Sequence, residues 1–299
     1  MIPSGRAMFG GWSRRAATGF AGRGGLASGR AKSGRARSGR PRRRSDPLWI
    51  RVLPALSVVL FLAVWEAAVR AGEVAPIILP APSSIARYLV AMIVDGTLPY
   101  NLAVTFLRIM AGFVVAGLLG VLVGVLMGMS RIAAKVLDPW IAALYPLPKI
   151  SLIPLLIIWL GTGEAYILTI SAVTAFFPVV ISTFAGIRQT SQELVKAARD
   201  LGASTRQIQM HVVIPAAIPS IFSGLHLGMG VTIILVVAAE MIGGSNQSGM
   251  GYLLIRYGQV METEKVFAAL VVLAVFGGVI IKAQQAIDRL VAPWAFGKP

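Results

Sequence analysis

Apolar stretches of about 20 residues recur along this chain from residue 48 onward. A helix needs about 20 mostly apolar residues to cross the roughly 30 Å of hydrocarbon in a bilayer. The composition agrees, because only 13% of the residues are charged and the mean hydropathy is +0.76. We therefore predict an all-α integral membrane protein with about six transmembrane helices. The predicted spans are 49–69, 102–127, 140–160, 165–187, 221–242 and 266–287.

A strongly basic segment precedes the first predicted span. Residues 1–47 are rich in Gly, Arg and Ser, and 12 of the 28 Lys and Arg residues lie before residue 45. We predict a disordered cytoplasmic tail that anchors the topology, contacts anionic lipid or reflects an over-long start. Nucleic-acid binding is disfavoured, because no aromatic residues are interleaved in its dense part.

The charge distribution predicts an orientation and three regions. With the tail in the cytoplasm, the segments 128–139, 188–220 and 288–299 also lie there, so both termini are cytoplasmic. The transmembrane domain is predicted to cover 48–293, with a short C-terminal tail at 294–299.

Several kinds of chemistry are excluded by the residues present. The chain has no cysteine, and its two histidines, His211 and His226, are far apart in sequence, so no metal site is expected. Neither a phosphate-binding GxxxxGK[ST] loop nor a GxSxG nucleophile pattern occurs. We expect no catalytic residue and no bound cofactor.

The second predicted span carries a stripe of small residues with a period of four. It consists of Gly112, Ala116, Gly120, Gly124 and Gly128. Such a stripe lets another helix approach closely, which any bundle of membrane helices could use.

Ionisable residues inside apolar spans are costly and are candidates for function. They are Glu66, Arg108, Lys149, Glu164 and Glu240. Lys149, in a proline-rich region with Pro148 and Ser151, either faces a pathway for an anion, pairs with a carboxylate or extends to an interface. Glu240 either belongs to an outer gate or forms a structural ion pair. We expect Glu164, in a short outer turn, to be solvated.

The most informative stretch is 192–220, QELVKAARDLGASTRQIQMHVVIPAAIPS, between two spans on the predicted cytoplasmic side. Leu194, Ala197, Ala198 and Leu201 have helical spacing, and Gly202 predicts a turn. A second short helix should follow. Pro215 and Pro219 are predicted to end it and to redirect the chain into the fifth span.

This stretch resembles the cytoplasmic EAA loop of ABC-importer permeases. That pattern is Glu-Ala-Ala, three residues, Gly, nine residues and an apolar-x-apolar-Pro ending. Here Ala197, Ala198, Gly202, Ile214 and Pro215 match, whereas Lys196 replaces the usual glutamate. PLPKISLIPL at 146–155, WLGTGE at 159–164, AEMIG at 239–243, SGMGYL at 248–253 and LPAPS at 79–83 are similar to the nitrate/sulfonate/taurine branch.

The resemblance implies a function. The chain would be the permease of an ATP-driven importer, with Lys196, Ala197, Ala198, Gly202, Ile214 and Pro215 coupling it to a separate ATPase that uses ATP and Mg²⁺. A periplasmic or lipid-anchored binding protein would deliver a small oxyanion or sulfonate to a homodimer in the bacterial inner membrane. Pro148, Lys149, Ser151 and Glu240 are the candidate pathway residues. The alternatives are a secondary transporter or channel independent of ATP, and a membrane-tethered nucleic-acid-binding protein.

Overall fold

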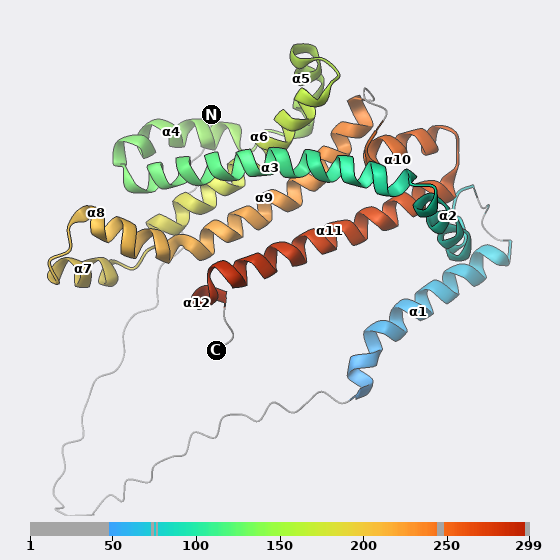
Figure 1. Cartoon of the computed structure of the whole chain (residues 1–299), viewed down its shortest axis with the longest axis horizontal. Coiled ribbons are helices and arrows are strands. Elements are labelled where there is room, and N and C mark those ends of the chain that lie inside the picture. Colours follow the sequence, from blue (N-terminus) through green and yellow to red (C-terminus); the bar gives the residue numbers. More distant parts are fainter. Residues whose placement is uncertain (1–47, 73–74, 76, 244–247, 297–299) are drawn as a thin grey trace, which may run out of the picture. The chain divides into compact units, whose positions relative to one another are not determined.

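The computed structural model describes residues 48–72, 75, 77–243 and 248–296, and within these ranges it contains helices and no strand (Figure 1). The chain divides into two compact units, Met1–Arg51 and Val52–Pro299. The predicted basic tail lies outside the described residues, so only the start of α1 represents the first unit. The helices are α1 (Leu48–Arg70), α2 (Pro82–Val94), α3 (Thr97–Met129), α4 (Arg131–Leu144), a 3₁₀ turn η1 (Lys149–Leu152), α5 (Ile153–Leu160), α6 (Glu164–Arg188), α7 (Gln192–Asp200), α8 (Thr205–Ile208), a π-helical turn η2 (Gln209–Val213), α9 (Ile214–Gly243), α10 (Met250–Gln259), α11 (Thr263–Val291) and α12 (Pro293–Phe296).

Five helical stretches in the described part of the chain are long and apolar enough to cross a membrane. They coincide with the first, second, fourth, fifth and sixth predicted spans, so the all-α class is confirmed. The third predicted span is not one straight helix. There α4 and the segment Lys149–Leu160 meet at 87°, and they make a sixth span only if taken together.

The small-residue stripe of α3 packs directly against α6. A Cβ added at Gly120 would lie 2.9 Å from the side chain of Val179, and one at Gly124 would lie 2.6 Å from Thr183. Gly128 faces Ile187 in the same way. The helix backbones therefore approach as closely as glycine permits, which is how helices without a hydrophobic driving force gain packing energy in lipid.

These contacts make α3 and α6 parallel, because residue numbers rise together along both helices. Glu164, the first residue of α6, bonds to Arg108, so α6 begins near the start of α3 rather than near its end at Met129. The segment between the two helices must therefore return along roughly 30 Å of helix length, given a rise of 1.5 Å per residue. The bent pair of α4 and α5 makes this return.

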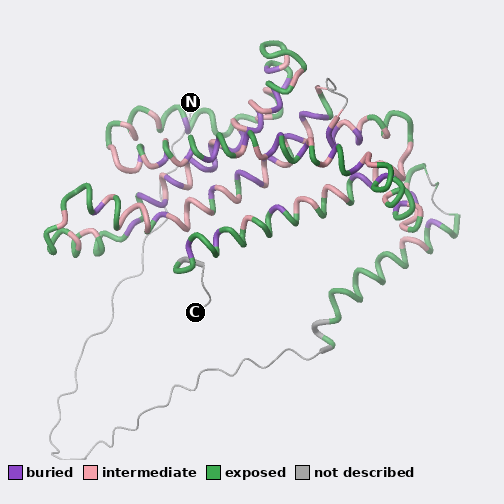
Figure 2. The backbone as a smooth tube through the Cα atoms, viewed as in Figure 1, coloured by how far each residue is buried: buried purple, intermediate pink, exposed green. Residues whose placement is uncertain are grey.

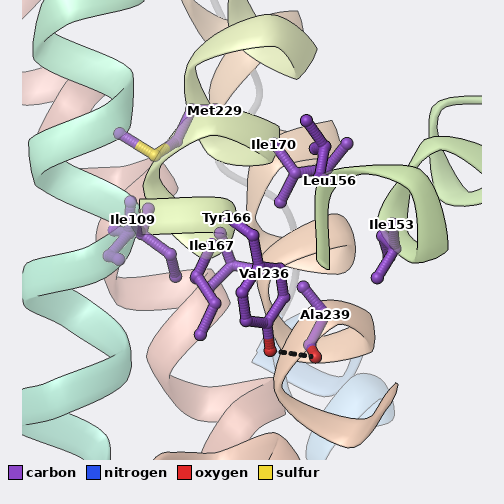
Figure 3. Close-up of a cluster of buried hydrophobic side chains, with 10 residues drawn as sticks. Ile109, Ile153, Leu156, Tyr166, Ile167, Ile170, Met229, Val236 and Ala239 are labelled. Carbon is purple, nitrogen blue, oxygen red and sulfur yellow. Dashed lines mark hydrogen bonds between the residues drawn. The ribbon is translucent and has the colours of Figure 1, made fainter. Parts of the chain in front are cut away.

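The helix α9 completes the centre of the bundle by running antiparallel to α6. Gly186 of α6 faces Ser220, whereas Gly224 faces Ser182, so the residue numbers run in opposite directions. A buried apolar cluster joins α3, α5, α6 and α9 (Figure 3). At its centre the hydroxyl of the fully buried Tyr166 donates to the carbonyl oxygen of Ala239 at 3.1 Å.

Many large apolar side chains on the outer surfaces of the spans are exposed. Figure 2 shows that most of α1 is exposed. Phe61 on α1, Leu118 on α3 and Ile234 on α9 are each more than 60% exposed. In water such surfaces would drive aggregation, whereas in a bilayer they contact lipid tails. The exposed apolar surface thus agrees with a membrane-embedded bundle.

The first turn of α3 is fixed by the residues just before it. Gly96 has a φ of +81°, which favours glycine, and Oδ1 of Asp95 accepts the backbone N–H of Thr97 at 2.8 Å. This hydrogen bond lowers the pKa of Asp95 below its ordinary value, because it favours the ionised carboxylate. A carboxylate also suits the positive end of the helix dipole.

Candidate functional site

The predicted helix after α6 forms, and one of its faces is apolar and exposed. α7 begins after Ser191, whose hydroxyl caps it by accepting the N–H of Glu193. Leu194 is 54% exposed and Leu201, just past the helix, is 89% exposed. Ala197 is also exposed, so these three residues form an outward apolar stripe that we call the α7 stripe.

The turn after α7 requires glycine. Gly202 has a φ of +85°, a region that other residues enter at a cost of about 1–2 kcal/mol. No heavy atom lies within 4 Å of a Cβ built at this position, so the requirement comes from the backbone and not from crowding. α8 then begins with a capping box, in which Ser204 and Gln207 bond to each other's backbone N–H groups.

One detail of the predicted loop is wrong. Pro215 and Pro219 do not end the second short helix, because α8, η2 and α9 follow one another without a break from Thr205 to Gly243. Pro215 lies inside this continuous helical run, where it has no N–H to donate to the preceding turn. The π-helical turn just before it shifts the hydrogen-bond register, and such turns are frequent at functional sites.

The region of Lys149 lies where the third span is broken. α4 ends at Leu144, and the chain turns through Tyr145–Pro148 before η1 begins at Lys149. Pro148 precedes η1 in an extended conformation, and both Pro148 and Ser151 are exposed. Irregular backbone at membrane depth is tolerated only where it is covered by protein or lines a polar cavity.

The ammonium group of Lys149 has few partners. It donates to the carbonyl oxygen of Tyr145, near the negative end of α4, and lies 4.9 Å and 5.1 Å from the ring centroids of Tyr145 and Phe177. Among the described residues, no carboxylate lies within 4.0 Å of it. Of the alternatives that the sequence left open for Lys149, pairing with a carboxylate is therefore not seen among the described residues.

Lys149 borders a cavity of about 360 Å³ between α3, the broken span and α6. The walls are apolar apart from the lysine. They comprise Val115, Ala116, Leu119, Leu144, Leu147, Leu152, Ala172, Val173, Phe176 and Phe177. Since residues 115–119 and 172–177 lie near the middle of their spans, this cavity lies about halfway along the bundle.

Glu240 lies elsewhere, in a buried network around Arg108. Both side chains are almost fully buried, and Nη1 of Arg108 donates to Oε1 of Glu240 at 2.8 Å. Nε and Nη2 of the same guanidinium donate to the two carboxylate oxygens of Glu164 at 2.8 Å and 2.5 Å. The remaining N–H groups contact the carbonyl oxygen and hydroxyl of Ser248, so all five donors are used.

This network also holds the start of α10. The backbone N–H groups of Gly249, Met250 and Gly251 donate in turn to the side chains of Asn101, Thr105 and Glu240 at 2.7–2.9 Å. The first turn of a helix has no internal partners for its N–H groups. Side chains from α3 and α9 therefore cap α10.

The network corrects one sequence-based expectation and adds two residues. Glu164 is not simply solvated, because its half-exposed carboxylate is held in a bidentate pair by Arg108. Asn101 and Thr105 were not predicted as site residues. The available signal was their spacing with Arg108, since Thr105 and Asn101 precede it by three and seven residues, and such positions share one helix face.

The structure separates the predicted residues into three places. The coupling residues lie at one end of α6 and α9, whereas Glu240 lies at the opposite end of α9. Lys149 lies between these two ends of the bundle. It lines the same cavity as Val115, which is seven residues, or about two helical turns, after Arg108 on α3. Glu240 and Lys149 therefore do not form one site.

Comparison with known proteins decides the family. A family model described as "Binding-protein-dependent transport system inner membrane component" matches residues 116–293. The chain belongs to this family. It is an inner-membrane permease that crosses the bilayer several times. The matched region contains the loop 192–220 and most residues that line the cavity, whereas Arg108 lies before it.

Two relatives of this permease, from Escherichia coli and Bacillus subtilis, carry names that state what they transport. The chain is 32% identical to the taurine transport system permease protein TauC of Escherichia coli (strain K12), over 80% of this chain and 88% of that protein. It is 33% identical to the putative aliphatic sulfonates transport permease protein SsuC of Bacillus subtilis (strain 168), over 82% and 88%. The predicted resemblance to an ABC permease of the taurine and sulfonate type is thus confirmed.

Among solved structures, inward-facing conformations of the MetNI methionine ABC transporter are similar to this permease. The similarity has a TM-score of 0.49 and 20% identity, and it covers 62% of this chain and 92% of that chain.

Proposed function

We propose that this permease forms the membrane pathway of an importer powered by a separate ATPase. The relatives' names suggest a small sulfonate or related oxyanion as the solute. A binding protein outside the membrane would deliver that solute, and two copies of the permease would enclose the pathway. Hydrolysis of ATP and binding of Mg²⁺ would take place on the partner.

The α7 stripe is the observation that carries this proposal. Leu194, Ala197 and Leu201 are apolar and exposed on a short helix that belongs to no candidate span. Lys196 and Arg199 lie beside them on the same short helix. An exposed apolar stripe flanked by charges suits the groove of a protein partner.

The covalent connections suit transmission of movement. α7 follows α6 within a few residues, and α8 leads through η2 into α9. Because α6 and α9 are packed through Gly186 and Gly224, a displacement of α7 and α8 would move two central helices together. In the proposed cycle, the ATPase pair closes on ATP, shifts these helices and thereby changes the population of outward-open bundle.

Co-purification with candidate ATP-binding-cassette ATPases from the same organism tests the proposal. We expect wild type to form a stable complex whose ATPase activity in lipid depends on the permease. Gly202→Val should lower complex recovery or coupled activity about tenfold, because valine disfavours positive φ and would distort the turn. Gly202→Asn should be milder, since asparagine tolerates that conformation better.

Two further variants isolate the coupling surface. Leu201→Asp should also weaken the complex, because it places a charge in the α7 stripe without disturbing a buried contact. Gly96→Val is the matched control, since Gly96 has a similar φ of +81° and equally open surroundings but lies at the start of α3. If no ATPase binds, or if Gly202→Val and Gly96→Val lower complex recovery and ATPase activity equally, the proposal is wrong and transport without ATP is favoured.

A further inference from the structure

The lysine cavity offers a cation that the described residues leave without a carboxylate. The ammonium group of Lys149 donates one hydrogen bond to the carbonyl oxygen of Tyr145. No carboxylate oxygen of the described residues lies within ion-pair distance of it. Ionisable residues at membrane depth are costly and rare, and they usually mark ligand pathways. The other contacts of the ammonium group are with the rings of Tyr145 and Phe177, so among the described residues its charge has no anionic partner.

The walls of the cavity specify the rest of the ligand. Val115 and Leu119 line one side and Phe176 and Phe177 another, and apart from Lys149 the lining side chains are apolar. A small polar anion such as nitrate would leave most of its oxygens without donors there. A zwitterion such as taurine would bury an ammonium group against apolar walls, next to a second cation.

The position of the cavity suits a ligand in transit. It lies near the middle of α3 and α6, at the break of the third span. Discontinuous helices at the bilayer midplane commonly build transport sites. The volume of about 360 Å³ is also within the range of small-molecule sites.

We propose that this cavity binds a monoanion with a compact oxyanion head and an apolar alkyl or aryl tail. The head pairs with Lys149, and the tail packs between Leu119 and the two phenylalanines. This inference rests on the proposed transport function, which it deepens by placing a solute-binding site within the permease itself. It makes Lys149 and the cavity walls determinants of specificity inside the permease.

Calorimetric titration of the purified permease–ATPase complex in phosphatidylcholine nanodiscs tests this inference. The probes are 1-pentanesulfonate, methanesulfonate and taurine, and empty nanodiscs give the partitioning background. We expect pentanesulfonate to bind at least tenfold more tightly than methanesulfonate or taurine, since each buried methylene contributes about fourfold in affinity. Equal affinity for pentanesulfonate and methanesulfonate would contradict the apolar tail.

Matched variants locate the binding in this cavity. Lys149→Met should weaken pentanesulfonate binding at least tenfold, whereas Lys149→Arg keeps the charge and Lys135→Met removes an exposed lysine of α4; both should bind nearly as wild type does. Leu119→Trp should also weaken binding by filling the cavity. Leu126→Trp is its control, because Leu119 and Leu126 are equally exposed on α3, at 50% and 51%, but only Leu119 lines the cavity.

The outcomes separate this inference from the proposed function. A complex that assembles and responds to Gly202→Val, but binds pentanesulfonate equally well in wild type and Lys149→Met, overturns the inference alone. Mass spectrometry of the extracted complex tests whether a lipid occupies the cavity instead. An anionic lipid retained by wild type and lost from Lys149→Met, without pentanesulfonate binding, also overturns it. If Lys149→Met does not fold, Leu119→Trp decides, since that side chain is half exposed.

Discussion

At the scale of single residues, Arg108 and Arg70 show how burial changes the value of an ion pair. Arg70 pairs with Glu66 at 2.5 Å, but its side chain is 69% exposed. Such pairs contribute about 0–1 kcal/mol, because water competes for both partners. Arg108 is 3% exposed and its partner Glu240 is fully buried. Removing one member of a buried pair leaves the other charge without compensation.

Arg108→Met is therefore expected to destabilise the permease by about 3–5 kcal/mol, by stranding the buried carboxylate of Glu240. Thermal unfolding in nanodiscs measures the loss. Arg70→Met should change stability by less than about 1 kcal/mol. The double variant Arg108→Met/Glu240→Gln should recover part of the loss, since no buried charge remains at position 240. A double variant no more stable than Arg108→Met would argue against this account.

At the scale of helices, the contact between α3 and α6 depends on residues that lack side chains. Gly124 lies so close to Thr183 and the carbonyl oxygen of Val180 that a Cβ would overlap both. Gly230, on α9, has no heavy atom within 4 Å of the same position. Gly124 and Gly230 both lie inside spans, but a methyl group would overlap neighbouring atoms at Gly124 and would have open space at Gly230.

Gly124→Ala is predicted to lower stability by about 1–3 kcal/mol, because α3 and α6 must separate to admit the methyl group. Gly230→Ala should be neutral or stabilising by up to about 1 kcal/mol, since alanine favours helix more than glycine does. Thermal unfolding of the two variants in the same lipid makes the comparison. Equal effects would mean that the stripe does not set the helix separation.

At the scale of the whole molecule, the course of the segment between α3 and α6 decides the topology. The parallel packing of these helices requires residues 130–163 to return along the bundle. In the proposed orientation, Lys135 and Glu193 then lie on the cytoplasmic side, whereas Gly163 and Glu262 lie outside. The 87° bend does not change this conclusion, because the return is fixed by where α6 begins.

Single-cysteine labelling tests this topology, and the chain suits it because it contains no cysteine of its own. We expect Gly163→Cys and Glu262→Cys to react with a membrane-impermeant maleimide in intact spheroplasts. Lys135→Cys and Glu193→Cys should react only in inverted vesicles. A re-entrant loop in place of a sixth span would instead put Gly163 on the same side as Lys135.

The sequence by itself determined the elements whose signals are local. Spans follow from runs of apolar residues, the α3 stripe from a period of four, and the turn at Gly202 from the one residue that accepts positive φ readily. The break near Lys149 was visible as an irregular proline-rich span. The sharp bend of this span was not visible in the sequence. The continuous helix from α8 to α9 was not visible either, because prolines usually interrupt a helix, whereas here a π-helical turn precedes Pro215 and the helix continues.

Only the tertiary structure decided which polar groups meet. Arg108 is separated in sequence from both Glu164 and Glu240, and either carboxylate alone could have belonged to a turn or a gate. The register of α3 against α6, set by glycines, brings Glu164 to the level of Arg108. Lys149 lies further along the same helix pair, too far from this network to share its carboxylates. Local patterns fix helices, whereas pairing between them depends on how backbones pack, and no single segment encodes that.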